Sequence, residues 1–334
     1  MHAIGDLATF MLSKQFQARL RMSAETAAEE ATTGLAKNRI KHLGGSSLAI
    51  SLLDRKTQLL KQHQLGNAET AVFASATQSI LQRVQEQSGA LAKNLSLVSQ
   101  LNSAPEVKAL SDSAALAFVD IVNALNADVA GLFLFSGAAT NARPLPSGQA
   151  LMDMLRADIG GPISADVAIS AVESWFKAPN GPFETTAYSG SATGFAQRPI
   201  GPDQTVIFGL RADGETVRDL LSALATAALA SDDALGLTLT EQKKLLLEGH
   251  SDLLKADRAL TEERAGLGLS EAMIDASRNA TDIELDRVSM DRVSLLGVDQ
   301  FEAASEFEAA QQQLEVFYRI AARQSRVSLA EYLR

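Results

Sequence analysis

The stretch GLFLFSGAATNARP, residues 131–144, packs four large apolar residues into five positions and then changes to small and turn-forming residues. The sequence on both sides is rich in Ala and Leu and is dotted with Gln, Ser and Asn. This pattern predicts that residues 132–135 finish a helix and seal it onto a helical bundle. Gly137 and the prolines that follow then release the chain into a different kind of structure.

The positions of the prolines support this division. All 8 prolines lie between Pro105 and Pro202. Because a proline in a helix interior costs about 3 kcal/mol, the two flanks can form long helices, whereas the middle cannot.

The N-terminal flank carries an apolar stripe with alternating steps of four and three residues, interrupted by polar Gln87 and Asn94. A second helix is expected to begin near Pro105, because proline suits the first helical turn. The stripe comprises Phe73, Thr77, Ile80, Val84, Gln87, Leu91, Asn94, Val98 and Leu101.

The C-terminal flank has the same periodicity, with Thr240 as the predicted N-cap of its first helix. A further helical run follows Gly297, with Phe307, Leu314 and Phe317 on one face. The predicted stripe of the first helix comprises Leu246, Leu253, Ala256, Leu260 and Leu267, continued by Met273, Ala276, Ala280, Ile283 and Met290.

Residues 141–219 are rich in Gly, Pro, Ser and Thr, and the segment QTVIFGLRADGETV reads as a strand entering a tight turn. The sequence therefore predicts a mainly α protein: an elongated antiparallel helical rod with a small inserted α+β domain, and a coiled coil formed by the N- and C-terminal segments. The expected segments are an N-terminal assembly helix (1–45), rod helices (46–140), a mixed tip domain (141–219), C-terminal rod helices (220–296) and a C-terminal assembly helix (297–334).

The composition argues against several classes of partner. A formal net charge of -10 and an isoelectric point near 5.0 disfavour nucleic acid and anionic membrane surfaces, which both need clustered Lys and Arg. The first lysine is Lys14, so the start lacks the basic region of a secretory signal, and we expect no cleaved signal peptide. The longest run of large apolar residues, VAGLFLF, is far short of the roughly 20 residues that span a bilayer, so no membrane insertion is expected.

Catalysis finds little support in the sequence. There is no cysteine, and the four histidines stand apart from one another without a metal-ligand spacing. The segment KNRIKHLGGSS, residues 37–47, could hold an anion, but it lacks the ending of a phosphate loop, and a break between two helices is favoured. We therefore expect no catalytic residue, no metal site, no cofactor and no enzymatic activity.

Large apolar residues on both terminal segments are the remaining feature. One interpretation is that the termini pair and bury these faces within one molecule. The other is that neighbouring subunits complete them, because narrow apolar faces at chain ends leave area uncovered. The predicted assembly interface comprises Leu7, Phe10, Met11, Phe301, Phe307, Leu314, Phe317, Leu329, Tyr332 and Leu333.

Four motifs together resemble the bacterial flagellin superfamily. They are EEATTGLAKNRIKHLGGSSLAISL (29–52), GLFLFSG (131–137), EERAGLG (262–268) and the closing segment that ends in SLAEYLR. That ending contains the aromatic Tyr332, and in this it resembles the hook-associated proteins of the hook–filament junction more than filament flagellins. The sequence departs from the superfamily at HLGGSSLA, where relatives usually carry an Asp-Asp turn.

The resemblance implies a mechanical role. It implies a ring of identical subunits that joins hook to filament, next to flagellin and a neighbouring hook-associated protein. It also implies export to the extracellular flagellum in unfolded form, without a cleaved signal, aided by a cytoplasmic export chaperone. Two alternatives stay open: filament flagellin itself, and a cytoplasmic helical scaffold or signalling coiled-coil protein.

Overall fold

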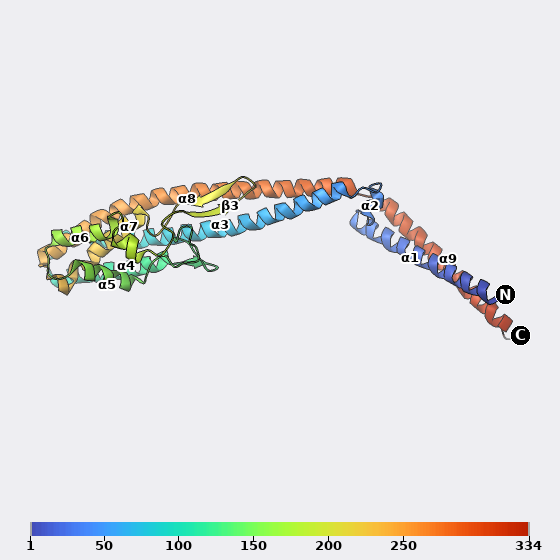
Figure 1. The fold of residues 1–334 in the computed structure, drawn as a ribbon, viewed down its shortest axis with the longest axis horizontal. Coiled ribbons are helices and arrows are strands. Elements are labelled where there is room, and N and C mark those ends of the chain that lie inside the picture. The colour runs from blue at the N-terminus through green and yellow to red at the C-terminus, as the bar shows by residue number, and fades with distance from the viewer. Residues whose placement is uncertain (1, 333–334) are drawn as a thin grey trace. The chain divides into compact units, whose positions relative to one another are not determined.

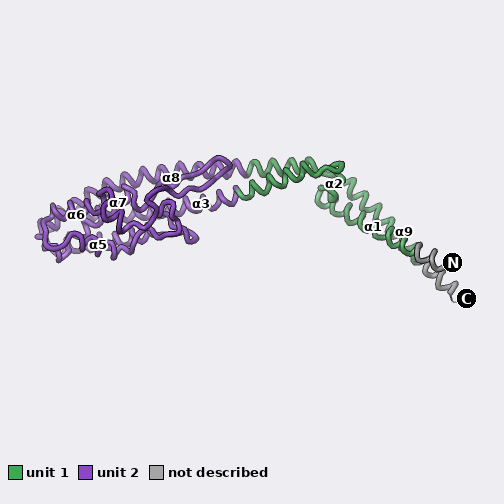
Figure 2. The backbone as a smooth tube through the Cα atoms, in the orientation of Figure 1, with its two compact units in different colours: residues 1–62, 282–334 green, residues 63–281 purple. Residues whose placement is uncertain are grey.

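The structure is a computed structural model that describes the backbone of residues 2–332 and the side chains of residues 10–323. Most of the described chain is helical (Figure 1). It divides into two compact units, residues 1–62 with 282–334 and residues 63–281 (Figure 2). The prediction of a mainly α fold with an inserted α+β segment is confirmed, whereas the five-segment division stays a prediction.

The first unit joins the two ends of the chain. Its helices are α1 (His2–Thr33), the short α2 (Arg39–His42) and α9 (Gln300–Tyr332), together with the start of α3 (Leu48–Leu95) and the end of α8 (Leu239–Leu296).

Helices α1 and α9 lie side by side and antiparallel (Figure 1): Phe16 contacts Phe317 at one level, and Leu35 bridges to Gly297 at another. Between α1 and α3, α2 and the turn through Gly44 and Gly45 form the expected break in the helices.

The second unit is built around α7 (Glu215–Ala228). Every residue from 220 to 230 is buried, because α4 (Ala104–Leu125) and α6 (Ala165–Lys177) pack on this helix, and α5 (Gly148–Ile159) lies against both α4 and α6. Trp175, Phe176 and Phe183 form an aromatic cluster with ring centroids 4.7 to 5.8 Å apart. Single turns complete the helical part: Val98–Gln100, Phe183–Ala187, Leu229–Ser231 and Asp233–Leu235.

The predicted stripe on α8 is correct in its first half and wrong in its second. Leu246, Leu253, Leu260 and Leu267 are buried at steps of seven, and the same step continues through Ile274, Thr281 and Val288. Met273, Ile283 and Met290 are exposed instead. A helix turns by about 100° per residue, so seven residues after Leu267 the chain returns to the buried face, whereas six residues bring it about 120° away.

The start of α8 also differs from the prediction. The helix begins at Leu239, and Thr238 rather than Thr240 caps it. The Thr238 hydroxyl accepts a hydrogen bond from the Glu241 backbone N–H (3.4 Å), and the Glu241 carboxylate accepts one from the Thr238 backbone N–H (3.0 Å). This is a capping box, which satisfies two backbone donors at a helix start.

Residues 132–135 do not finish a helix, which corrects the first expectation. Helix α4 ends at Leu125, and the chain then forms a small antiparallel hairpin of β1 (Asp128–Val129) and β2 (Leu132–Phe133). Ala130 and Gly131 both have positive φ, as a two-residue hairpin turn requires, and the Asp128 carboxylate accepts a hydrogen bond from the Gly131 N–H at 2.9 Å. Leu134 and Phe135 are buried in the core, so the stretch seals the bundle as expected, but by a turn.

A second hairpin carries the predicted strand. Strands β3 (Ala196–Pro199) and β4 (Thr205–Phe208) pair antiparallel, with Ala196 opposite Phe208. Phe208 packs edge-on against Phe73 of α3, with ring centroids 4.8 Å apart. Ser277 of α8 donates a hydrogen bond to the Ile200 carbonyl. The hairpin is therefore fastened to both long helices of the second unit.

Candidate assembly interface

The paired terminal helices bury small residues and leave large ones uncovered. Leu20, Ala24, Ala27, Ala303 and Ala310 are the buried hydrophobic residues of α1 and α9 among the side chains that the structure describes. Because four of these five are alanines, the two helices approach closely but remove little apolar surface from water.

The structure leaves three of the ten predicted interface residues exposed: Phe10 (59%), Met11 (57%) and Phe301 (82%). Phe307, Leu314 and Phe317 are half-buried. Leu7, Leu329, Tyr332 and Leu333 lie outside the described side chains. Their role in assembly stays a prediction.

Sequence reasoning missed further exposed apolar residues on the same helices. On α1 these are Leu12, Phe16 and Met22, and on α9 they are Val316 and Ile320. The signal that could have found them is the spacing of four between Leu12 and Phe16 and between Val316 and Ile320, which keeps each pair on one helix face. A groove runs along this surface and is lined by Phe16, Ala309, Gln312, Gln313, Val316, Phe317 and Ile320.

Two kinds of contact hold α1 against α9 near this groove. The rings of Phe16 and Phe317 lie 5.9 Å apart, tilted by 47°. The Tyr318 hydroxyl oxygen accepts hydrogen bonds from Gln17 Nε2 (3.0 Å) and Arg21 Nη2 (2.8 Å). These donors lower the pKa of Tyr318, because they favour the phenolate. The pairing is thus specific in register, although it covers little surface.

The segment that follows α1 and the segment where α8 ends, before α9, are joined by backbone hydrogen bonds. The Ala36 N–H donates to the Leu296 carbonyl at 2.8 Å, and the Val298 N–H donates to the Gly34 carbonyl at 3.0 Å. These bonds fix the two chain segments side by side at the base of the helix pair.

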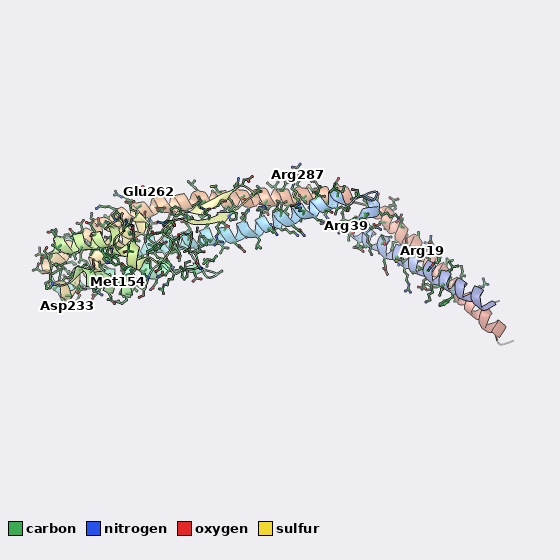
Figure 3. All side chains as sticks on the ribbon, in the orientation of Figure 1. Arg19, Arg39, Met154, Asp233, Glu262 and Arg287 are labelled. Atoms are coloured by element: carbon green, nitrogen blue, oxygen red, sulfur yellow. The ribbon has the colours of Figure 1, made fainter. Side chains whose placement is uncertain are left out.

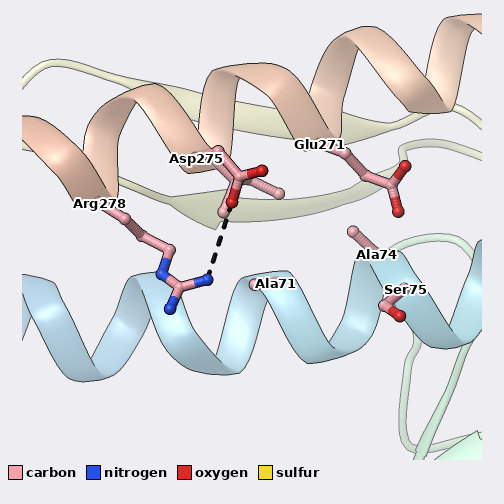
Figure 4. Close-up of a pocket in the computed structure, with 7 residues that line it drawn as sticks. Ala71, Ala74, Ser75, Glu271, Asp275 and Arg278 are labelled. Carbon is pink, nitrogen blue, oxygen red and sulfur yellow. Dashed lines mark ion pairs between the residues drawn. The ribbon is translucent and has the colours of Figure 1, made fainter.

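A second concavity lies between α3 and α8 in the second unit (Figure 4). It exists because α3 contributes small side chains there, Ala71, Ala74 and Ser75. On the α8 side, Arg278 and Asp275 form an ion pair at 3.7 Å. The Asp275 carboxylate is paired with a neighbour on its own helix, and the arrangement does not resemble a catalytic pair.

Other candidate chemistry is weak. Among the residues that the structure describes, no group of three or more His, Cys, Asp or Glu could hold a metal ion. Across the same residues, no helix is long and apolar enough to cross a membrane. Asp232 and Asp233 are adjacent acidic residues, and the Asp232 carboxylate accepts a hydrogen bond from Arg156 Nε at 2.7 Å.

A buried charged cluster in the second unit fastens loops rather than a ligand. The Arg211 guanidinium lies against the Asp213 carboxylate (2.8 Å) and donates to the Ala192 carbonyl (2.8 Å). Burial raises the pKa of Asp213, with Arg211 opposing that shift, and burial also raises the pKa of Tyr188. Arg211 therefore links the loop at Ala192 to Asp213.

Together the fold and the exposed helix faces define a class of protein: a helical chain whose two ends pair in an antiparallel unit with an incompletely covered apolar surface. Residues 241–333, which include most of α8 and all of α9, match the family model of the bacterial flagellin C-terminal helical region. The resemblance to the flagellin superfamily is confirmed over this region.

Comparison with solved structures finds several similar chains. A structure described as "putative flagellar hook-associated protein from Vibrio parahaemolyticus" is similar over 73% of this chain and 96% of its own, with 14% sequence identity and a TM-score of 0.42. Among curated proteins, none matches the sequence.

Proposed function

We propose that this protein is a structural component of the bacterial flagellum, an adaptor at the hook–filament junction that assembles through its paired terminal helices. One observation carries the proposal: the helix that matches the flagellin C-terminal region, α9, exposes large apolar residues while it is paired with α1. A contiguous patch of exposed apolar side chains is typical of a protein interaction site.

The mechanism is completion of burial by neighbouring copies. Phe10, Met11 and Phe301 contribute little to a single molecule, because they face water. Burying a large apolar side chain contributes about 1.5–3 kcal/mol, so a few such residues per subunit favour association substantially. The ten predicted interface residues are the proposed contacts, those at the extreme ends included.

The finer assignments belong to the same proposal. The subunits form a ring, with flagellin and another hook-associated protein as neighbours, and the protein acts outside the cell without catalysing a reaction. It leaves the cell unfolded, and an export chaperone covers the C-terminal apolar face beforehand. The Tyr332-containing ending supports the junction role over that of filament subunit.

Deletion of residues 301–334 tests the terminal interface. We expect the shortened protein to keep the circular dichroism signal of the second unit and to lose assembly, measured by light scattering and electron microscopy. The full chain with Phe301→Ser should assemble poorly with unchanged thermal stability. Leu116→Ser is the matched control, because Leu116 is also highly exposed but lies on α4 in the second unit. If Leu116→Ser impaired assembly as much as Phe301→Ser, the proposal that assembly uses the terminal helices would be contradicted.

A null strain tests the biological role. Bare hooks, with filament subunits lost to the medium, support the junction adaptor. Purified protein that polymerises without limit would favour filament flagellin instead. Recovery of the protein only from the cytosol, and not from sheared flagella, would favour a helical scaffold protein.

A further inference from the structure

The start of α3 and the end of α8 pair with each other in the first unit. Lys56 forms an ion pair with Glu284, and Asp54 forms one with Arg292, with Oδ1 and Nη1 3.4 Å apart. Ile50 and Val288 are buried. This contact therefore uses one face of each helix.

The opposite face of α3 carries a second apolar stripe. Leu48, Leu52 and Leu59 are exposed, at 68%, 58% and 50%. Leu59 is nine residues from buried Ile50, which places it about 180° around the helix. Arg55 completes the stripe, so its steps are four, three and four, the spacing of a helix that packs against another helix.

The end of α8 has a stripe of the same kind. Ile283, Met290 and Val293 are exposed, at 68%, 71% and 55%, and Asp286 lies between them at steps of three and four. Met290 is two residues from buried Val288 and so points about 200° away from it. Arg287, labelled in Figure 3, lies about 100° further around the helix than Asp286 and flanks the stripe.

Each stripe therefore contains three apolar residues and one charge, and the two charges are opposite. Neither Arg55 nor Asp286 belongs to an ion pair in the described part of the chain. Contact between two α3 stripes would bring Arg55 near a second Arg55, and contact between two α8 stripes would bring two Asp286 side chains together. Only contact between an α3 stripe and an α8 stripe matches apolar residues and also pairs opposite charges.

We propose that the outer face of α3, residues 48–59, packs against the outer face of α8, residues 283–293, of a second copy of this chain. Because two different surfaces meet, the contact is heterologous, and its repetition generates a closed ring or an open helical array. The proposal rests on the self-assembly proposed above and assigns to it a side-to-side contact distinct from the terminal helices.

Charge reversal tests the contact. R55D and D286R should each lower the association constant of the full-length protein at least about tenfold, since like charges across an interface are strongly unfavourable. The R55D/D286R double variant should recover to within about threefold, because the pair is restored in reversed order. The control reverses an exposed pair of the second unit, K108D with D112K, which should leave association unchanged.

Cysteine cross-linking tests the geometry, because the chain has no cysteine of its own. Under oxidising conditions at high protein concentration, L52C mixed with M290C should give covalent dimers, and each variant alone should not. The L52C/M290C double variant should give a ladder of larger species. Cross-linking of either single variant with itself would overturn the heterologous arrangement.

The two proposals fail in different ways. If the unmodified protein shows no association by light scattering in sulfate, which strengthens apolar burial, the proposed function fails. If the unmodified protein assembles and R55D and D286R assemble equally well, the α3–α8 contact alone is overturned.

Discussion

The two units of the molecule differ in how far their phenylalanine side chains are buried. Phe118, Phe135, Phe176 and Phe183 are fully buried in the second unit, whereas Phe10, Phe16 and Phe301 on the terminal helices are exposed. Both regions are helical, so secondary structure does not separate them. What differs is whether one chain supplies all the surfaces that its apolar side chains need.

This difference explains how one chain can be stable by itself and still be ready to assemble. Helix nucleation is unfavourable, so a long helix in water depends on packing of its apolar face. The second unit has this packing within the chain. Among the side chains that the structure describes, the terminal pair has mainly an alanine-rich contact and a few side-chain bonds, so much of its apolar surface stays uncovered within one molecule.

The largest expected effect is on the core of the second unit. Phe176→Ala should lower the free energy of unfolding by about 3–5 kcal/mol, because it leaves a cavity in a packed aromatic cluster. Phe301→Ala is the matched change on the exposed side, and it should change the free energy by no more than about 0.5 kcal/mol. Urea unfolding followed by circular dichroism measures both. Equal losses would remove the distinction between the units.

A smaller effect should come from Gly137, the last residue of the GLFLFSG motif. Gly137 has a φ of +62°, and a Cβ there would lie 2.8 Å from the Gly194 carbonyl oxygen. Gly137→Ala should therefore cost about 1–3 kcal/mol. Gly131 has a φ of +80° with no atom within 4 Å of a Cβ, so Gly131→Ala should cost only the strain of about 1 kcal/mol. Thermal unfolding that ranks Gly131→Ala as the worse change would contradict this account.

Within the first unit, Phe317→Ala should have a modest and local effect on stability. It removes a ring pair that contributes about 0.5–1.5 kcal/mol beyond its buried area. Amide hydrogen exchange should quicken along α1 near Leu20 and Ala24, while α7 keeps its protection. Faster exchange throughout α7 would mean that the two units unfold together.

The smallest effect concerns two tyrosines and pH. The Tyr318 pKa is lowered, so its ionised form is favoured by folding; this contribution is present above the ordinary value near 10 and is lost as pH falls through the lowered value. The Tyr188 pKa is raised, so its contribution is present below that ordinary value and is lost as pH rises through the raised one. Ultraviolet titration of Tyr318→Phe and Tyr188→Phe should show that Tyr318 ionises first. The reverse order would contradict the different surroundings assigned to them.

Much of the fold followed from local patterns. The start of α4 at Ala104 followed from Pro105, and strand β4 followed from its Val-Ile-Phe run. These features depend on neighbours in sequence, which are visible without coordinates.

What the sequence did not predict depends on tertiary context. The α8 stripe was ambiguous after Leu267, because Met273 and Ile274 are both apolar and the partner helix α3 decides which one is buried. The hairpin at 128–133 was hidden by a run of large apolar residues that suits a helix end equally well. In the candidate interface, Val316 and Ile320 were missed because Phe317 between them gave the stronger signal for a stripe.

The backbone bridge between Gly34–Ala36 and Leu296–Val298 has a consequence for the order of synthesis. Its two halves come from opposite ends of the polypeptide, so a ribosome makes α1 long before it makes α9. At roughly 5–20 residues per second, about 15–60 s pass between the emergence of the first helix and completion of the last. During that interval α1 has no partner helix within its own chain, and its phenylalanine side chains can contact other molecules in the cell.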